Sequence, residues 1–263
     1  MAVGAALSTL HLAMQVSALP QALWRARLAL AASEACAQFS GRPENPAQMR
    51  DEVHLLRPGE APGPAGAILQ AWLRATERPI SPASLQRALP HLDAAQLGAW
   101  TGAGATAPLS GAGQIMQAVL ADLPRADTTA LILADSALSQ ALGWRHMLPL
   151  LAQGMTRRDL ARRDAELHLA CAGAIVTSAR HALTLAAELT RKAEALRAMT
   201  PRLRAKGADQ AVALLLTQDA LAPSRALVPL MSDRAARRFC ERLVELGVLR
   251  ELTGRDSFRL YGV

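Results

Sequence analysis

The chain has 263 residues and a formal net charge of +7, with 51% hydrophobic but only 3% aromatic residues. Alanine, the strongest helix former, dominates the hydrophobic fraction, and few segments are rich in the β-branched and aromatic residues that sheets favour. The composition argues against a mainly β protein. It predicts a mainly α-helical chain, long enough for one large domain or two smaller ones.

The positive charge is unevenly distributed. Residues 1–153 carry ten basic and ten acidic side chains, residues 154–206 carry eleven and five, and residues 207–263 carry eight and seven. A basic middle segment attracts polyanions, although a solvated helix face has the same composition. Nearly all the basic residues are arginines, which suit phosphate and guanine recognition and are also typical of GC-rich genomes.

Three scattered cysteines without a CxxC pair argue against a disulfide framework or a zinc site and fit a reducing compartment. The six histidines show no metal-ligand spacing, so we expect no metal and no cofactor. The first twenty residues lack the basic start of a signal peptide, and the apolar stretch 167–187 contains Arg180 and His181. We therefore expect a cytoplasmic protein without a membrane span.

Helical periodicity, prolines and caps divide the first half of the chain into short helices. Pro20 suits a first helical turn, and Ser81-Pro82 combines a cap with a first-turn proline. The Pro- and Gly-rich segment 57–64 predicts a stiff loop. The helices are expected at about 18–39, 47–55, 65–75, 82–89, 94–100, 114–123 and 131–142.

The Gly-rich segment 101–113 resembles a phosphate-binding loop only superficially. It lacks the Gly-Lys-Ser/Thr ending of such a loop, and no strand precedes it, so a flexible linker is the better interpretation. Asp135 lies in an apolar helix, where a cap or a core hydrogen bond is expected rather than catalysis. The four tryptophans are expected to anchor the core: Trp24, Trp72, Trp100 and Trp144.

A long helix is predicted after the capping pattern Thr156 to Asp159, because no proline occurs before Pro201. Either one helix of more than forty residues, roughly 65 Å long, or two helices with a bend at Gly173 fit this segment.

The pattern changes in the last part of the chain. Short helices are predicted at 209–217 and 223–228, followed by a third helix that Ser232 caps and Gly247 ends. A period of two then predicts strands at 248–252 and 257–261 around a turn at 253–256. This order of helices and a hairpin predicts a winged helix-turn-helix.

In the helix-turn-helix mode the third helix enters the major groove of DNA, led by its N-terminal residues. This mode places Ser232, Arg234, Arg237 and Arg238 nearest the bases, with Arg242 on the same outer face. Arg225, Arg255 and Arg259 are expected to contact phosphates, and Arg202, Arg204 and Lys206 add positive charge beside them.

The sequence thus predicts a helical bundle (1–153), a long basic helix or connector (154–206) and a winged helix-turn-helix (207–263). We expect a transcriptional or replicon-associated regulator that binds double-stranded DNA as a homodimer, without catalytic residues. The alternative is an adaptor whose winged helix binds another protein, because winged helices also serve as protein-binding modules. An enzyme would need a deep pocket with converging titratable groups.

Several segments resemble an uncharacterised bacterial family, DUF1403. They are Leu55 to Gly66, Ala141-Leu142-Gly143-Trp144 with Leu148 to Leu151, Arg202 to Gly207, and the ending from Met231 to Gly262. The ending is also similar to the C-terminal winged helix of Fic-related proteins. The AMP-transferring motif of those proteins, His-Pro-Phe followed by an acidic residue and a Gly-rich turn, is absent, so their activity is not implied. The resemblance to DUF1403 implies no catalytic residues.

Overall fold

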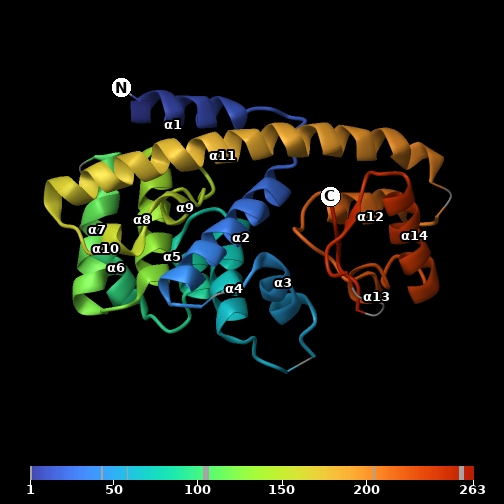
Figure 1. Ribbon diagram of the computed structural model, residues 1–263, viewed down its shortest axis with the longest axis horizontal. Coiled ribbons are helices and arrows are strands. Elements are labelled where there is room, and N and C mark those ends of the chain that lie inside the picture. The colour runs from blue at the N-terminus through green and yellow to red at the C-terminus, as the bar shows by residue number, and fades with distance from the viewer. Residues whose placement is uncertain (1, 43, 58, 103–106, 204, 255–257) are drawn as a thin grey trace.

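Helices form most of the structure. The computed structural model describes the chain except residues 1, 43, 58, 103–106, 204 and 255–257 (Figure 1). In the described residues, fourteen α-helices and one short 3-10 helix stand beside a single pair of two-residue strands. The prediction of a mainly α-helical protein is confirmed.

Eleven helices precede the C-terminal part in the described chain. They are α1 (Ala2–Ala13), α2 (Gln21–Phe39), α3 (Pro46–His54), α4 (Pro64–Glu77), α5 (Pro82–Ala88), α6 (Ala94–Gly102), α7 (Pro108–Asp122), α8 (Asp127–Ala141), α9 (Leu151–Gly154), α10 (Arg157–Leu160) and α11 (Asp164–Met199). Most lie within a few residues of their predicted positions. Helix α1 was not predicted.

Local side-chain chemistry explains why the short helices start where they do. Asn45, Ser81 and Thr156 each accept a hydrogen bond from the backbone of the first turn, while the third residue of each helix bonds back to the cap. Helix α7 begins earlier than predicted because Pro108 occupies its first turn, where the missing N–H costs nothing. The predicted linker therefore ends before residue 108, and residues 103–106 lie outside the described chain.

Helix α11 runs along the length of the molecule, with α1 beside it (Figure 1). It passes through Gly173 without a break, but it does not include the predicted first turn, because residues 161–163 separate it from α10. Its 36 residues correspond to about 54 Å. Helix α9 packs so closely against it that a Cβ on Gly154 would lie 2.4 Å from Cα of Ala174.

Helix α11 is also long and apolar enough to cross a membrane, judged by length and composition. Part of its apolar surface is buried inside the molecule. Leu167, Cys171, Ile175, Leu189 and Leu196 all belong to the protein core. The core helix of a folded protein passes the same test, so this property is weak support for a membrane span.

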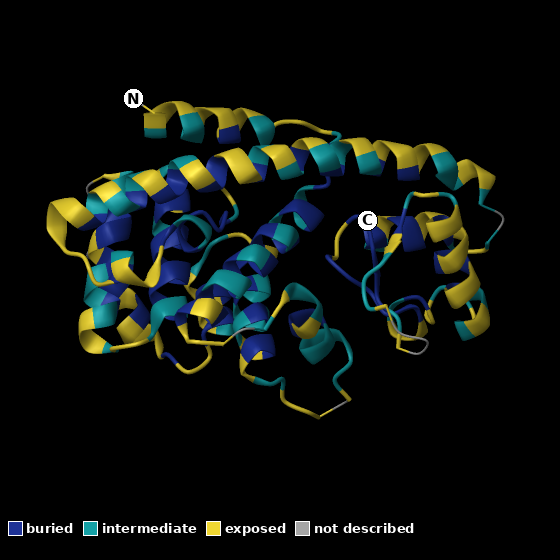
Figure 2. Ribbon diagram, viewed as in Figure 1, coloured by how far each residue is buried: buried dark blue, intermediate teal, exposed yellow. Residues whose placement is uncertain are grey.

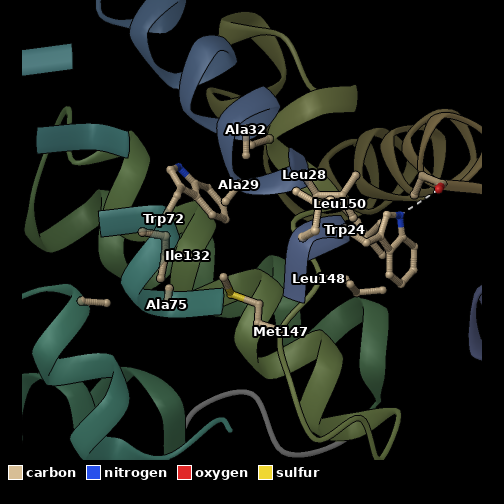
Figure 3. Close-up of a cluster of buried hydrophobic side chains, with 14 of the residues drawn as sticks. Trp24, Leu28, Ala29, Ala32, Trp72, Ala75, Ile132, Met147, Leu148 and Leu150 are labelled. Carbon is tan, nitrogen blue, oxygen red and sulfur yellow. Dashed lines mark hydrogen bonds between the residues drawn. The ribbon is translucent and has the colours of Figure 1, made fainter. Parts of the chain in front are cut away.

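The main core lies under α11, between α2, α4, α7 and α8. The four tryptophans predicted as anchors are all buried, and Trp24 and Trp72 are fully so. Figure 3 shows Trp24 and Trp72 among Leu28, Ile132 and their neighbours. The indole Nε1 of Trp24 donates to the carbonyl oxygen of Ala182 at 2.9 Å and so joins α2 to α11.

Asp135 is fully buried in α8 and serves as a structural acceptor, as predicted. Its carboxylate oxygens accept hydrogen bonds from the backbone N–H groups of Leu150 and Leu151, each at 3.1 Å. These groups lie at the start of α9, which has no other side-chain cap. Burial raises the pKa of Asp135 to about 8, although the two backbone hydrogen bonds oppose this shift.

The C-terminal part lies at the far end of α11 (Figure 1). It contains the 3-10 turn η1 (Thr200–Arg202), α12 (Ala208–Leu215), α13 (Pro223–Ala226), α14 (Asp233–Glu245), β1 (Arg250–Glu251) and β2 (Tyr261–Gly262). The strands are antiparallel, with Arg250 opposite Gly262, and an isolated bridge joins Leu221 to Tyr261. Both strands are shorter than predicted, and β2 begins at Tyr261, the last residue of the predicted strand.

A buried ion-pair cluster holds the C-terminal part against α2 and α3. Asp219, only 6% exposed, accepts hydrogen bonds from Nε and Nη2 of Arg50 at 2.6 and 3.1 Å. It also forms an ion pair with Arg27, whose Nε lies 2.7 Å from Oδ1 without the geometry of a hydrogen bond. Arg27 also donates from Nη2 to the carbonyl oxygen of Val263 at 2.9 Å. A two-pronged arginine–carboxylate pair fixes distance and orientation together, so these contacts determine how the C-terminal part is seated.

Candidate nucleic-acid interface

Helix α14 is strongly two-sided. Ala236, Phe239, Cys240 and Leu243 are buried against the rest of the C-terminal part and share one face of the helix. Ser232 caps the helix by accepting from the N–H of Ala235, and Gly247 follows it at φ +72°, the left-handed conformation that glycine tolerates. The helix therefore ends where the sequence predicted and has a fixed outward face.

The outward face carries the predicted arginines. Figure 2 shows α14 at one end of the molecule with its outer surface exposed. Arg234, Arg237, Arg238 and Arg242 are all exposed, as is the cap residue Ser232. None of these arginine side chains is packed under another element, so a large partner can reach this surface.

The four arginines differ in whether they form ion pairs within the protein. Arg237 pairs with Asp233 at 2.6 Å and Arg242 with Glu245 at 2.8 Å, in both cases within the helix. Such exposed pairs contribute at most about 1 kcal/mol, so a phosphate can replace the carboxylate. Within the described part of the chain, Arg234 and Arg238 form no ion pair or hydrogen bond.

A groove of about 390 Å³ separates α14 from the connector that follows η1. Arg234, Arg238 and Arg242, spaced one helical turn apart, lie along one side of it. Leu203 and Phe239 provide apolar surface. An arginine row over an apolar floor can bind a chain of phosphates or an acidic peptide, because both present regularly spaced anionic oxygens.

A second hollow, of about 320 Å³, lies on the other side of α14, beside the hairpin. Arg237 and Glu241 face Arg259 and Tyr261 across it, and the exposed Phe258 lies at its edge. A hydrogen bond with Tyr261 and the charge of Glu251, whose Oε2 lies 3.7 Å from Nε of Arg259, raise the pKa of Arg259. Arg259 is therefore partly neutralised by its own hairpin.

Arg225 is exposed and contacts the end of α3. Its Nη1 donates to the carbonyl oxygen of His54 at 3.0 Å and also to that of Leu56. This contact ties α13 to the start of the Pro- and Gly-rich loop. The predicted phosphate contact of Arg225 stays a prediction.

The basic residues of segment 154–206 are spread along α11 and are not gathered beside α14. Arg202 and Lys206 are exposed and flank the groove-lining connector in sequence. Arg157, Arg158, Arg162 and Arg163 instead lie near the start of α11, at the opposite end of that helix. Two further predicted residues, Arg204 and Arg255, lie outside the described residues.

The sequence did not identify Asp219, Arg27 and Arg50, although they position the interface. Arg50 and Arg27 precede Asp219 by 169 and 192 positions, and no local pattern links them to it. A signal that the sequence offered was the pair of arginines, Arg25 and Arg27, within the apolar run of α2. In the described chain, no three His, Cys, Asp or Glu side chains come together in a way that could hold a metal ion.

The comparisons assign a family but no activity. No curated protein matches the chain. The similarity of the ending to Fic-related winged helices remains a prediction. The family described as "Protein of unknown function (DUF1403)" matches residues 1–263, which is the whole chain. The chain therefore belongs to the DUF1403 family.

Proposed function

We propose that the protein binds double-stranded DNA through its C-terminal part, with α14 in the major groove. The observation that carries the proposal is the exposed outer face of α14, where Arg234 and Arg238 have no protein partner in the described chain. Arginine is the residue that most often reads guanine, through two parallel hydrogen bonds to its major-groove edge.

The order of elements supports the proposal. A helix (α12), a bridge residue (Leu221), two further helices (α13 and α14) and a two-stranded hairpin follow one another in the order of a winged helix. In such domains the last helix enters the groove and the hairpin lies over the adjacent backbone. On this reading Ser232, Arg234, Arg237 and Arg238 contact bases, while Arg242, Arg259, Arg202 and Lys206 contact phosphates.

The proposal includes a dimer and a regulatory role in transcription or replicon maintenance. Helix-turn-helix proteins commonly bind two half-sites about one DNA turn apart, which requires two copies related by symmetry. The helical part is the region available for pairing, because α14 must remain free to contact DNA.

Loss of a base-contacting arginine should reduce sequence preference. We expect Arg237→Ala and Arg238→Ala to bind a selected duplex about 5- to 100-fold more weakly, while binding to random duplex changes little. Duplex selection from a random pool followed by fluorescence anisotropy measures both quantities. Arg180→Ala is the matched control, because Arg180 is an exposed arginine on α11. Equal loss in the control would contradict the proposal.

Loss of a phosphate contact should act differently. Arg202→Ala and Lys206→Ala should weaken binding to every duplex, and each should reduce the slope of log K against log salt by about one unit. The measurement is anisotropy over a range of salt concentrations. Binding that responds neither to salt nor to these variants would rule out a DNA-binding function for this surface.

The second candidate function is that of an adaptor, and the exposed apolar residues of the C-terminal part favour it. Phe258 is 74% exposed and Val228 46% exposed. Large exposed side chains of this kind mark protein-binding surfaces when they cluster. Stoichiometric co-purification of a partner that Phe258→Ser releases, with no duplex binding at low salt, would favour the adaptor over the DNA-binding protein.

A further inference from the structure

A cleft on the helical part carries positive charge that no acidic residue of its walls balances. It has a volume of about 420 Å³ and lies between the end of α1, the start of α2 and the loop after α8. Arg25, Arg145, His146 and His11 line it, and none of the lining residues is an aspartate or a glutamate. Small-molecule sites typically have volumes of this order.

Both arginines have N–H groups that can bind a ligand. Arg25 projects from α2, and its Nε donates to the carbonyl oxygen of Thr76 at 3.0 Å. Both Nη groups of Arg25 remain without a hydrogen-bond partner in the described chain. Burial lowers the pKa of Arg25. Arg145 is exposed on the loop. Within the described residues neither arginine has a carboxylate partner, so water or a bound anion must compensate both charges.

The pKa of His146 reflects the positive charge of the two arginines. Its pKa is lowered to about 4, first by burial and then by the charges of Arg25 and Arg145. His146 is therefore neutral at pH 7 and able to donate one hydrogen bond to an anion. An anion between the two guanidinium groups would reverse their effect and raise this pKa.

The remaining walls provide an apolar surface and one more donor. Trp144 and Leu148 are buried residues that line the cleft beside Met14. The indole Nε1 of Trp144 donates to Nδ1 of His11 at 3.2 Å, so in neutral His11 the hydrogen is on Nε2. The lining of the cleft thus combines donors that suit anionic oxygens with apolar side chains that suit a compact apolar group.

We propose that this cleft binds a small organic anion, a carboxylate or phosphate attached to a compact apolar group. Arg25 and Arg145 hold the anionic oxygens, since the planar guanidinium matches both carboxylate and phosphate. Trp144 and Leu148 contact the apolar group. The site contains no residue of α14, so it is independent of the proposed DNA-binding function.

Calorimetry on the full chain tests the site with four probes: acetate, phenylacetate, inorganic phosphate and phenyl phosphate. We expect one phenyl-bearing anion to bind once per chain and more tightly than its counterpart without the ring. The carboxylate and phosphate arms identify the headgroup. Failure of both phenyl-bearing anions to bind at about 10 mM, a concentration that would detect even millimolar affinity, would overturn the proposal.

Variants locate the bound anion. Arg145→Ala removes an exposed side chain and should weaken binding at least about tenfold, whereas Arg180→Ala should leave it unchanged. Arg25→Gln keeps a donor for Thr76 and should weaken binding similarly. Arg25 also lines a neighbouring cavity of about 440 Å³, which Arg74 lines and Arg145 does not. Loss of binding in Arg74→Ala but not in Arg145→Ala would overturn the assignment.

The pKa of His146 provides a readout that depends on charge rather than on folding. Its titration can be followed by NMR of the histidine ring. In the bound state the pKa should rise above about 4, because the anion opposes the charges of Arg25 and Arg145, the groups that face His146 from α2 and from its own loop. A bound anion that leaves this pKa unchanged would lie elsewhere, contrary to the proposal.

Discussion

Two buried carboxyl groups, those of Asp135 and Asp219, should strongly affect the stability of the fold. Asp135 lies among apolar residues with only two backbone N–H groups for compensation. Asp219 has two arginines. The first group therefore favours its neutral form, and the second functions as an ion pair that must remain complete.

Asp135 makes stability depend on pH. Its pKa in the folded chain, about 8, lies above its usual value, so its contribution is fully present below about pH 4 and is lost as the pH rises to 8. Asp135→Asn keeps an acceptor for Leu150 and Leu151 but does not titrate. Between pH 4 and 8 the variant should gain stability relative to the natural chain, by at most on the order of 5 kcal/mol. Urea unfolding at several pH values measures this, and parallel profiles would refute it.

Asp219 should be among the residues least tolerant of substitution. Asp219→Ala leaves the nearly buried guanidinium of Arg50 and that of Arg27 without a counter-charge, which costs about 3–5 kcal/mol. Glu44→Ala is the control, because it breaks a more exposed pair with Arg42 and should cost less than about 1 kcal/mol. Chemical denaturation compares the two, and similar losses would contradict the assigned role of the cluster.

At the scale of helices, the sequence predicted well those helix starts that depend on neighbouring residues. Capping residues and first-turn prolines are read from a few neighbouring positions, so the starts of α3, α5 and α14 were predicted within about one residue. Helix α1 was missed because its formation depends on packing against α11 rather than on a cap. The contacts of Arg225 with the carbonyls of His54 and Leu56 were not predicted for a similar reason, since these partners are distant in sequence.

The contact between α9 and α11 offers a test at the same scale. A methyl group at residue 154 would lie 2.4 Å from Cα of Ala174, a backbone atom that cannot move alone. Gly154→Ala should therefore destabilise the chain by about 1–3 kcal/mol. Gly173→Ala in α11 meets nothing within 4 Å and should stabilise it by about 0.5–1 kcal/mol. Thermal unfolding distinguishes them, and shifts of the same sign would contradict this packing.

At the scale of the whole molecule, one hydrophobic core joins the three parts that the sequence distinguished. Residues from α2, α11 and α14 belong to the same cluster of buried side chains. The arrangement of the C-terminal part on α2 and α3 was beyond prediction, because it depends on ion pairs between residues far apart in the chain. The division of the chain into residues 1–153, 154–206 and 207–263 remains a prediction.

Because the core is continuous, we expect the full chain to unfold in one cooperative transition. Calorimetry should give a van't Hoff enthalpy equal to the calorimetric enthalpy. Arg50→Ala should lower the temperature of that transition, since it leaves Asp219 with one arginine. Two separate transitions in the natural chain would show that the C-terminal part folds independently.

The path of α11 has a mechanical consequence. A straight rod of about 54 Å that carried α14 alone would act as a lever, and a bend of a few degrees near Gly173 would swing its far end by several ångströms. In the structure, the ion pairs of Asp219 also join the C-terminal part to α2 and α3, so the far end of α11 is held at a second point. The orientation of the arginine row on α14 therefore depends on the ion pairs of Asp219 with Arg27 and Arg50 and on the shared core, and not on the stiffness of α11 alone.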